Sequence, residues 1–276
     1  MDIPKFPTQK ALFDHLVANE KVLVAEKKAQ NKFTDSLKYI EVIDDVEGDV
    51  VKAVASSTKE LEITGDTMEA TLVINTTNIL DSHGDVHIDG IWTKTLSESR
   101  DLYLLREHQL KFEGVISDEV KASAKRMAWK DLGFPFEGNT QALIFKAIIR
   151  KKRNEYMFDQ YASRYVKNHS VGMQYVKMYL CINDENYSEH KAMWDKYIGK
   201  VVNPEAAEAR GYFWAVTEAK LVEGSAVLVG SNYATPVIGL TDTNKDNEPS
   251  NDTQEADKTE PPVSTQKRKS TQLFIN

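Results

Sequence analysis

The chain has 276 residues, of which 41% are hydrophobic, and its 35 basic and 42 acidic side chains give a formal net charge of −7. That acidic balance argues against a general nucleic-acid binder, which needs a basic face. Cys181 is the one cysteine, so no disulfide can form within the chain, which favours a reducing compartment. No apolar run approaches the roughly 18 residues of a membrane-spanning helix. We therefore expect a soluble protein with neither a membrane nor a specific nucleic acid as partner.

Residues 1–65 are predicted to form a helical arm and a polar lead-in. Apolar residues at helical spacing within 12–24 indicate one or two short amphipathic helices. Residues 39–43 and 50–54 alternate in a way that allows strands, although their surroundings are polar. We therefore place the start of the main domain at residue 66.

The main domain, residues 66–240, begins with a strand at 70–75, and a loop crowded with His and Asp follows at 81–89. Imidazoles and carboxylates together suit zinc or manganese. Asp, Ser, Gly and Asn are also ordinary turn formers, and the spacing matches no closed metal motif. We therefore predict a loop that holds no metal or other cofactor and that positions a short helix at 93–100.

Two ionisable residues stand out against apolar surroundings. His108 ends an apolar strand, where it is either an acid–base catalyst or a surface side chain. Glu223 lies inside the apolar run 221–229, and a buried carboxylate is costly unless a histidine or an arginine pairs with it. Glu218 competes for the same role, in a more polar setting.

Ser170 lies where a helical pattern over 154–168 gives way to a strand over 171–182 that is apolar on both sides. A serine at such a junction can be held rigidly with its hydroxyl facing an opening. Gly172 would then leave the neighbouring backbone bare for a substrate. The alternative is a serine whose hydroxyl is satisfied by backbone groups, as is common at the ends of elements.

The many strands of this domain are separated by turns and do not alternate regularly with helices. This pattern predicts an α+β fold with an antiparallel, partly closed sheet or barrel and packed helices. Residues 183–209 are polar and partly helical, which indicates an insertion over one side of the sheet. From residue 241 the composition changes to Thr, Asp, Asn, Glu, Pro and Ser, so we predict a disordered tail over 241–276.

Four blocks resemble the prohead maturation proteases of tailed bacteriophages, a serine protease family related to the herpesvirus assembly protease. These blocks are residues 78–96, 104–108, 168–173 and 221–236. The last block departs from the family's pattern, because Gly224 stands where the family usually has Val and Gly-Ser-Asn at 230–232 replaces Pro-Ala-Asn. The arm, the insertion and the tail lie outside the resemblance.

The resemblance implies a herpesvirus-protease-like fold and a serine endopeptidase with a Ser–His–Glu triad. Ser170 would be the nucleophile, and His108 the general base and then the general acid. Glu223 would hold the imidazole tautomer and offset its positive charge. The family also implies an oxyanion site of backbone amides or bound water, for which Val171 and Gly172 are candidates.

The implied substrates are segments of the phage major capsid protein and scaffold, cut inside the assembling prohead in the cytoplasm of the bacterial host. The protease would also cut itself, and self-association stays open. The alternative is an inactive family member that serves as an internal scaffold or docking protein, which the long arm and tail would fit. A non-viral β-rich binding module is a third alternative. Convergence of His108, Ser170 and Glu223 in space would distinguish an enzyme from a scaffold.

Overall fold

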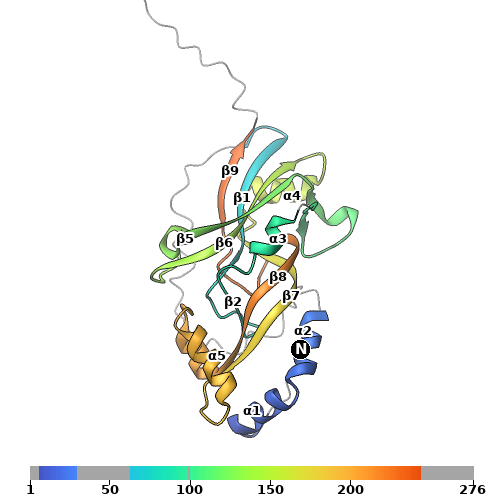
Figure 1. The fold of residues 1–276 in the computed structure, drawn as a ribbon. Coiled ribbons are helices and arrows are strands. Elements are labelled where there is room, and N and C mark those ends of the chain that lie inside the picture. The colour runs from blue at the N-terminus through green and yellow to red at the C-terminus, as the bar shows by residue number, and fades with distance from the viewer. Residues whose placement is uncertain (1–5, 30–62, 99, 244–276) are drawn as a thin grey trace, which may run out of the picture. The chain divides into compact units, whose positions relative to one another are not determined.

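Two β-sheets form the centre of the fold, which we describe from a computed structural model covering residues 6–29, 63–98 and 100–243 (Figure 1). By its internal contacts the chain divides into two units, 1–244 and 245–276, and the described residues all belong to the first. The strands expected at 39–43 and 50–54 and residues 244–276 of the expected tail lie outside the described residues.

The first sheet has four strands, and every pair of neighbours within it is antiparallel. Its strands, in spatial order, are β5 (Val120–Ala128), β6 (Asn139–Arg150), β1 (Thr67–Thr76) and β9 (Val237–Asp242). Strand β1 alternates between buried and half-buried residues at its start and is buried on both faces at its end. This change of pattern follows from its position, because its second half passes through the interior of the domain.

The second sheet is built around the long strand β8 (Tyr212–Val227). Strand β7 (Asn168–Ile182) pairs with β8 in antiparallel fashion along one side. On its other side β8 pairs in parallel with two short strands, β2 (Asp85–His87) and β3 (Leu104–Arg106). Strand β4 (Val115–Ser117) adds to β3 in antiparallel fashion.

The predicted mixed α+β class with antiparallel sheets is confirmed. The two parallel pairs were not predicted, because such pairing joins segments more than a hundred residues apart in the sequence. Among the residues that the structure describes, the strands do not close into a barrel. Within this same part of the chain, no helix is long and apolar enough to cross a membrane.

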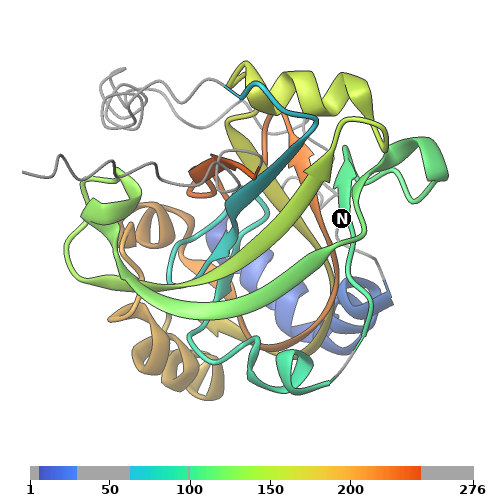
Figure 2. The same ribbon diagram turned by 90° about the horizontal axis from the view of Figure 1, so that it is seen from above.

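The two sheets pack against each other through apolar side chains, and Figure 2 shows strands of the first sheet lying across those of the second. Gly224 of β8 marks a close approach between them. A Cβ atom at this position would lie 2.6 Å from Phe145 Cε2 and 3.1 Å from Ile74 Cγ2. The ring of Phe145 therefore takes the space that a larger residue at position 224 would need. This explains physically why glycine stands where a valine was expected.

Six α-helices lie around the sheets in the described ranges. They are α1 (Gln9–Ala18), α2 (Glu20–Ala29), α3 (Thr93–Ser97), α4 (Glu155–Ala162), α5 (Ser188–Ile198) and α6 (Pro204–Arg210). The side chain of Thr8 caps α1, and Phe13 of this helix is buried, edge-on to Tyr187 and Tyr212. The residues predicted to form an insertion supply α5 and α6, and α5 packs against β7.

Helix α4 ends earlier than the pattern over 154–168 predicted. Arg164 takes a left-handed conformation with φ of 59°. The amide of Tyr165 bonds to the carbonyl of Gln160, and that of Arg164 to the carbonyl of Tyr161. This is a Schellman-type end, which satisfies the last carbonyls of a helix while reversing its course. Tyr165, counted as part of the apolar helical face, is 69% exposed as a result.

Strand β9 runs to Asp242, two residues into the predicted tail. The carboxylate of Asp242 accepts hydrogen bonds from the backbone amides of Thr64 and Gly65, at 2.9 and 3.1 Å, and from the Thr64 hydroxyl. These bonds join the two ends of the described domain, which explains why ordered structure extends past residue 240.

We expect Gly224→Val to lower the free energy of unfolding by roughly 3 kcal/mol, because the added side chain collides with a buried aromatic ring. Phe145→Ala alone should cost about 3–5 kcal/mol by leaving a cavity. The double variant should lose less unfolding free energy than the two single variants together, because the valine side chain can fill the cavity that the missing Phe145 ring leaves. Urea unfolding of the three variants checks this, and strictly additive costs would contradict the packing described.

Candidate functional site

His108 lies in a tight turn immediately after strand β3. The amide of Gln109 bonds to the carbonyl of Arg106 at 2.9 Å, and the two residues between them, Glu107 and His108, have φ values of 48° and 57°. The left-handed conformation costs an L-residue other than glycine about 1–2 kcal/mol. Two such residues in succession store strain, which is typical of functional sites. The turn directs the chain, and with it His108, back toward strand β8.

The imidazole of His108 contacts the carboxylate of Glu223. His108 Nδ1 and Glu223 Oε1 are 2.6 Å apart, and the two side chains are 6% and 0% exposed. The second carboxylate oxygen accepts a hydrogen bond of 2.6 Å from the Ser225 hydroxyl. A buried carboxylate is tolerated only when its oxygens are satisfied in this way. The contact also fixes the ring, because Nδ1 must carry the proton that it donates to the carboxylate.

Ser225 was not identified from the sequence, although it holds both partners. Its hydroxyl accepts a hydrogen bond from the backbone amide of His108 at 3.1 Å while it donates to Glu223. Residues two apart on a strand share a face, so the segment Glu-Gly-Ser at 223–225 already indicated that these two side chains are neighbours. The sequence did not show that His108, from a distant segment, lies beside these two side chains.

Gly172 allows the Glu223 carboxylate to occupy its place. The two residues are directly opposite in the β7–β8 pair. A Cβ atom on Gly172 would overlap Glu223 Oε1 and lie 2.8 Å from its carboxyl carbon. The sequence suggested that this glycine leaves room for a substrate. In the structure, Gly172 instead leaves room for the carboxylate that binds His108.

Ser170 lies on strand β7 directly opposite Ser225 and is buried. Residues opposite each other in an antiparallel pair point to the same face. Ser170 therefore shares a face of the β7–β8 pair with Ser225 and with Glu223, which is two residues away on the same strand. The structure thus brings His108 and Glu223 into contact and places Ser170 on the adjacent strand beside them.

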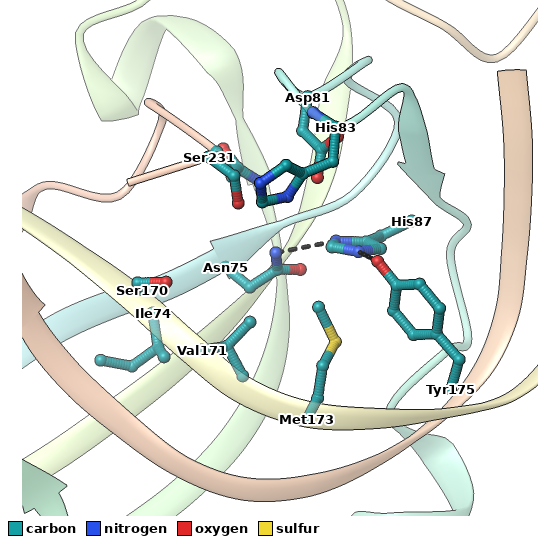
Figure 3. Close-up of a pocket in the computed structure, with 11 residues that line it drawn as sticks. Ile74, Asn75, Asp81, His83, His87, Ser170, Val171, Met173, Tyr175 and Ser231 are labelled. Carbon is teal, nitrogen blue, oxygen red and sulfur yellow. Dashed lines mark hydrogen bonds between the residues drawn. The ribbon is translucent and has the colours of Figure 1, made fainter. Parts of the chain in front are cut away.

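A pocket borders this group, and Ser170 is one of its lining residues (Figure 3). Strand β7 contributes apolar lining through Val171 and Met173. The polar lining comes mainly from segments far from β7 in the sequence: Asn75, Asp81, His83, His87, Ser231 and Asn232. Figure 3 shows the side chains of Asn75, His87 and Tyr175 in succession along one wall, joined by hydrogen bonds.

The segment at 81–89 forms a turn and a buried strand. Asp81 Oδ1 accepts hydrogen bonds from the amides of His83 and Asp85, both at 2.9 Å, which is the ordinary turn chemistry of aspartate. Asp85 and His87 belong to β2 and are buried. In the parts of the chain that the structure describes, no group of three or more His, Cys, Asp or Glu side chains is arranged to hold a metal ion.

His169, next to Ser170, is fully buried and neutral. The Tyr161 hydroxyl lies 3.0 Å from its Nε2, and its Nδ1 lies 3.1 Å from the carbonyl oxygen of Thr235. Nδ1 therefore carries the proton and donates it, and Nε2 accepts from the tyrosine. Burial lowers the pKa of His169 to about 4, and the Thr235 carbonyl offsets part of that effect. These contacts anchor the backbone on which Ser170 is held.

Two other candidates are excluded from this site. Glu218 forms ion pairs with Lys94 and Lys177 at 3.2 and 3.0 Å, and the hydrogen bond from Lys177 lowers its pKa. Cys181 is buried, and this burial raises the pKa of its thiol to about 12. A thiol with that pKa is a poor nucleophile.

Comparisons of the chain with protein-family models, with curated proteins and with solved structures gave no match. The chemistry that the site allows follows from its own geometry. That geometry combines a histidine oriented by a buried carboxylate, a serine on the neighbouring strand and a bordering pocket.

We expect Gly172→Ala to cost roughly 2 kcal/mol of stability and to displace the Glu223 carboxylate from His108. The strongly downfield proton signal of the His108 ring N–H, typical of a short hydrogen bond, should be lost from the NMR spectrum. Gly199→Ala is the matched control, because φ there is −65° and nothing lies within 4 Å of an added Cβ. An unchanged ring-proton signal in Gly172→Ala would contradict the proposed role of this glycine.

Stability should depend on pH through His169. Its folded-state pKa of about 4 lies below the unfolded value of 6.5. Between these two pH values the imidazole is protonated in the unfolded chain and neutral in the folded protein. The contribution is fully present above pH 6.5 and is lost as the pH falls toward 4, by about 3 kcal/mol in total. His169→Gln should flatten the dependence of unfolding free energy on pH over this range. The neutral neighbouring change Asn168→Gln should leave the slope as in the wild type; equal slopes in all three proteins would refute the assignment.

Proposed function

We propose that this protein is a serine endopeptidase with Ser170, His108 and Glu223 as its catalytic residues. The observation that carries the proposal is the 2.6 Å contact between His108 Nδ1 and the buried Glu223 carboxylate. Retaining a buried charge is costly for a protein, and here the charge orients an imidazole. Ser170, on the strand beside this pair, supplies the hydroxyl that such an imidazole can activate.

The chemistry follows from the fixed tautomer of His108. With Nδ1 donating to Glu223, Nε2 is the ring nitrogen that takes the proton of the Ser170 hydroxyl. The serine oxygen then bonds to the scissile carbonyl carbon, and the imidazolium returns the proton to the leaving amine as the C–N bond breaks. Water, deprotonated by the same ring, hydrolyses the resulting ester and restores the serine. The carboxylate of Glu223 offsets the transient positive charge of the imidazolium.

The substrate class rests on the resemblance of the site segments to phage prohead proteases. We propose that the substrates are segments of a phage major capsid protein and scaffold, and the enzyme itself, cut within the assembling prohead in the bacterial host cytoplasm. The herpesvirus-protease-like, partly closed arrangement of strands belongs to the same proposal. The arrangement of the His108 turn, β7 and β8 supports it, because each of these segments coincides with a resembling block.

Ser170→Ala should abolish cleavage of co-expressed capsid protein and of the protease itself. Loss of the nucleophile typically lowers turnover by about a millionfold in serine hydrolases, while stability should change by no more than about 1 kcal/mol. Ser117→Ala is the matched control. It removes another buried serine hydroxyl, one that donates to the carbonyl of Ile148 at 2.7 Å on strand β4.

Gel analysis and mass spectrometry of shells assembled with each variant give the readout. Shells with Ser117→Ala should mature as the wild type does, and those with Ser170→Ala should keep uncut proteins. If Ser170→Ala shells mature normally, Ser170 is not the nucleophile and an internal scaffold or docking role replaces the enzymatic one.

A further inference from the structure

A chain of buried polar groups connects helix α2 to the pocket that Ser170 lines. Lys27 of α2 points into the protein, where its Nζ lies 2.5 Å from Asp85 Oδ1. The two side chains are 5% and 0% exposed. The same ammonium lies 5.6 Å from the centre of the Trp214 ring. Lysine is almost never this buried unless it is paired, so the position of this side chain is a specific feature.

The pairing continues from Asp85 to the pocket wall. The Tyr175 hydroxyl donates to Asp85 Oδ2 at 2.7 Å, and His87 Nε2 lies 3.2 Å from the oxygen of that hydroxyl. The amide nitrogen of Asn75 donates to His87 Nδ1 at 2.9 Å. Three of these residues, Asn75, His87 and Tyr175, line the pocket (Figure 3).

The direction of every hydrogen bond in this chain is set by the charge at its end. An ionised carboxylate accepts and cannot donate, so the Tyr175 hydroxyl must give its proton to Asp85. The Tyr175 oxygen is then available to accept from His87, and the proton of the imidazole lies on Nε2. Nδ1 therefore accepts from Asn75. The wall of the pocket thus presents one defined set of donors and acceptors.

We propose that Lys27 is a positioning residue of this pocket, which acts by keeping Asp85 ionised and thereby fixing the Nε2–H tautomer of His87. Helix α2 is in this sense linked to the pocket, although Lys27 is not one of the residues that line it. The relation of this pocket to a substrate rests on the proposed function. The tautomer assignment does not.

Removing the Lys27 charge would leave a carboxylate buried beside an aromatic ring. Such a carboxylate takes up a proton instead of remaining charged. Protonated Asp85 can donate to Tyr175, which reverses the chain so that Tyr175 donates to His87 Nε2. The imidazole proton then moves to Nδ1. The Asn75 amide can accept it after a rotation, because its Oδ1 is buried without a hydrogen-bond partner in the present arrangement.

The test is the tautomer of His87, read from the ¹⁵N shifts of its ring nitrogens in the full-length labelled protein. The wild type should show protonated Nε2, and Lys27→Met should shift the ring to the Nδ1–H form. Lys28→Met is the matched control, since Lys28 is the exposed neighbour on the same helix. It should leave the ring as in the wild type, and Lys27→Arg, which keeps the cation, should restore the wild-type spectrum.

A wild-type ring protonated on Nδ1, or a folded Lys27→Met protein with unchanged ring shifts, would overturn the proposal. Should Lys27→Met fail to fold, Tyr175→Phe takes its place, because it interrupts the chain and leaves the Lys27–Asp85 pair intact. Retention of the Nε2–H form in Tyr175→Phe would likewise overturn it. If Ser170→Ala proves fully active, the enzymatic function fails while the tautomer result still stands by itself.

Discussion

The buried carboxylate of Glu223 is the constraint on which the candidate site depends. A charge in the protein interior must be paired and hydrogen-bonded, and here His108 and Ser225 together satisfy both of its oxygens. The remaining features follow from this requirement. Gly172 has no side chain because the carboxylate fills that space. The turn at 106–109 contains two left-handed residues, and it brings His108 into contact with Glu223 of strand β8.

His108, Ser170 and Glu223 could be identified from the sequence. Glu223 is a charged residue within an apolar run, and His108 and Ser170 lie at the ends of predicted elements. A glutamate within an apolar strand and a histidine at a strand end are visible without coordinates. Ser225 and the true role of Gly172 were not predicted, because both depend on the register of β7 against β8 and on a parallel pairing between distant segments. The end of α4 was misjudged for a related reason. The apolar spacing continues through Tyr165, but a left-handed Arg164 ends the helix first.

The fold class was predictable from the many turn-separated strands, whereas the arrangement of the strands was not. Strand β8 pairs with β7 on one side and with β2 and β3 on the other, so it brings together segments from residue 85 to residue 227. Local patterns carry no information on such contacts. The same limit applies to Lys27, which belongs to a helix with a charged sequence and whose side chain is buried against Asp85.

Glu223 and Asp85 present the same physical problem near opposite ends of strand β8. Each is a fully buried carboxylate, and each is paired with a side chain from a distant segment, His108 in one case and Lys27 in the other. Replacing such pairs by apolar residues is often neutral or stabilising in proteins, so neither pair is explained by stability alone. Each carboxylate does determine which nitrogen of a histidine carries a proton. Two imidazoles, His108 and His87, are thereby held in opposite tautomers, with protons on Nδ1 and Nε2 respectively. The same physical device, a buried carboxylate paired with a side chain from a distant segment, thus sets the position of the proton on both rings.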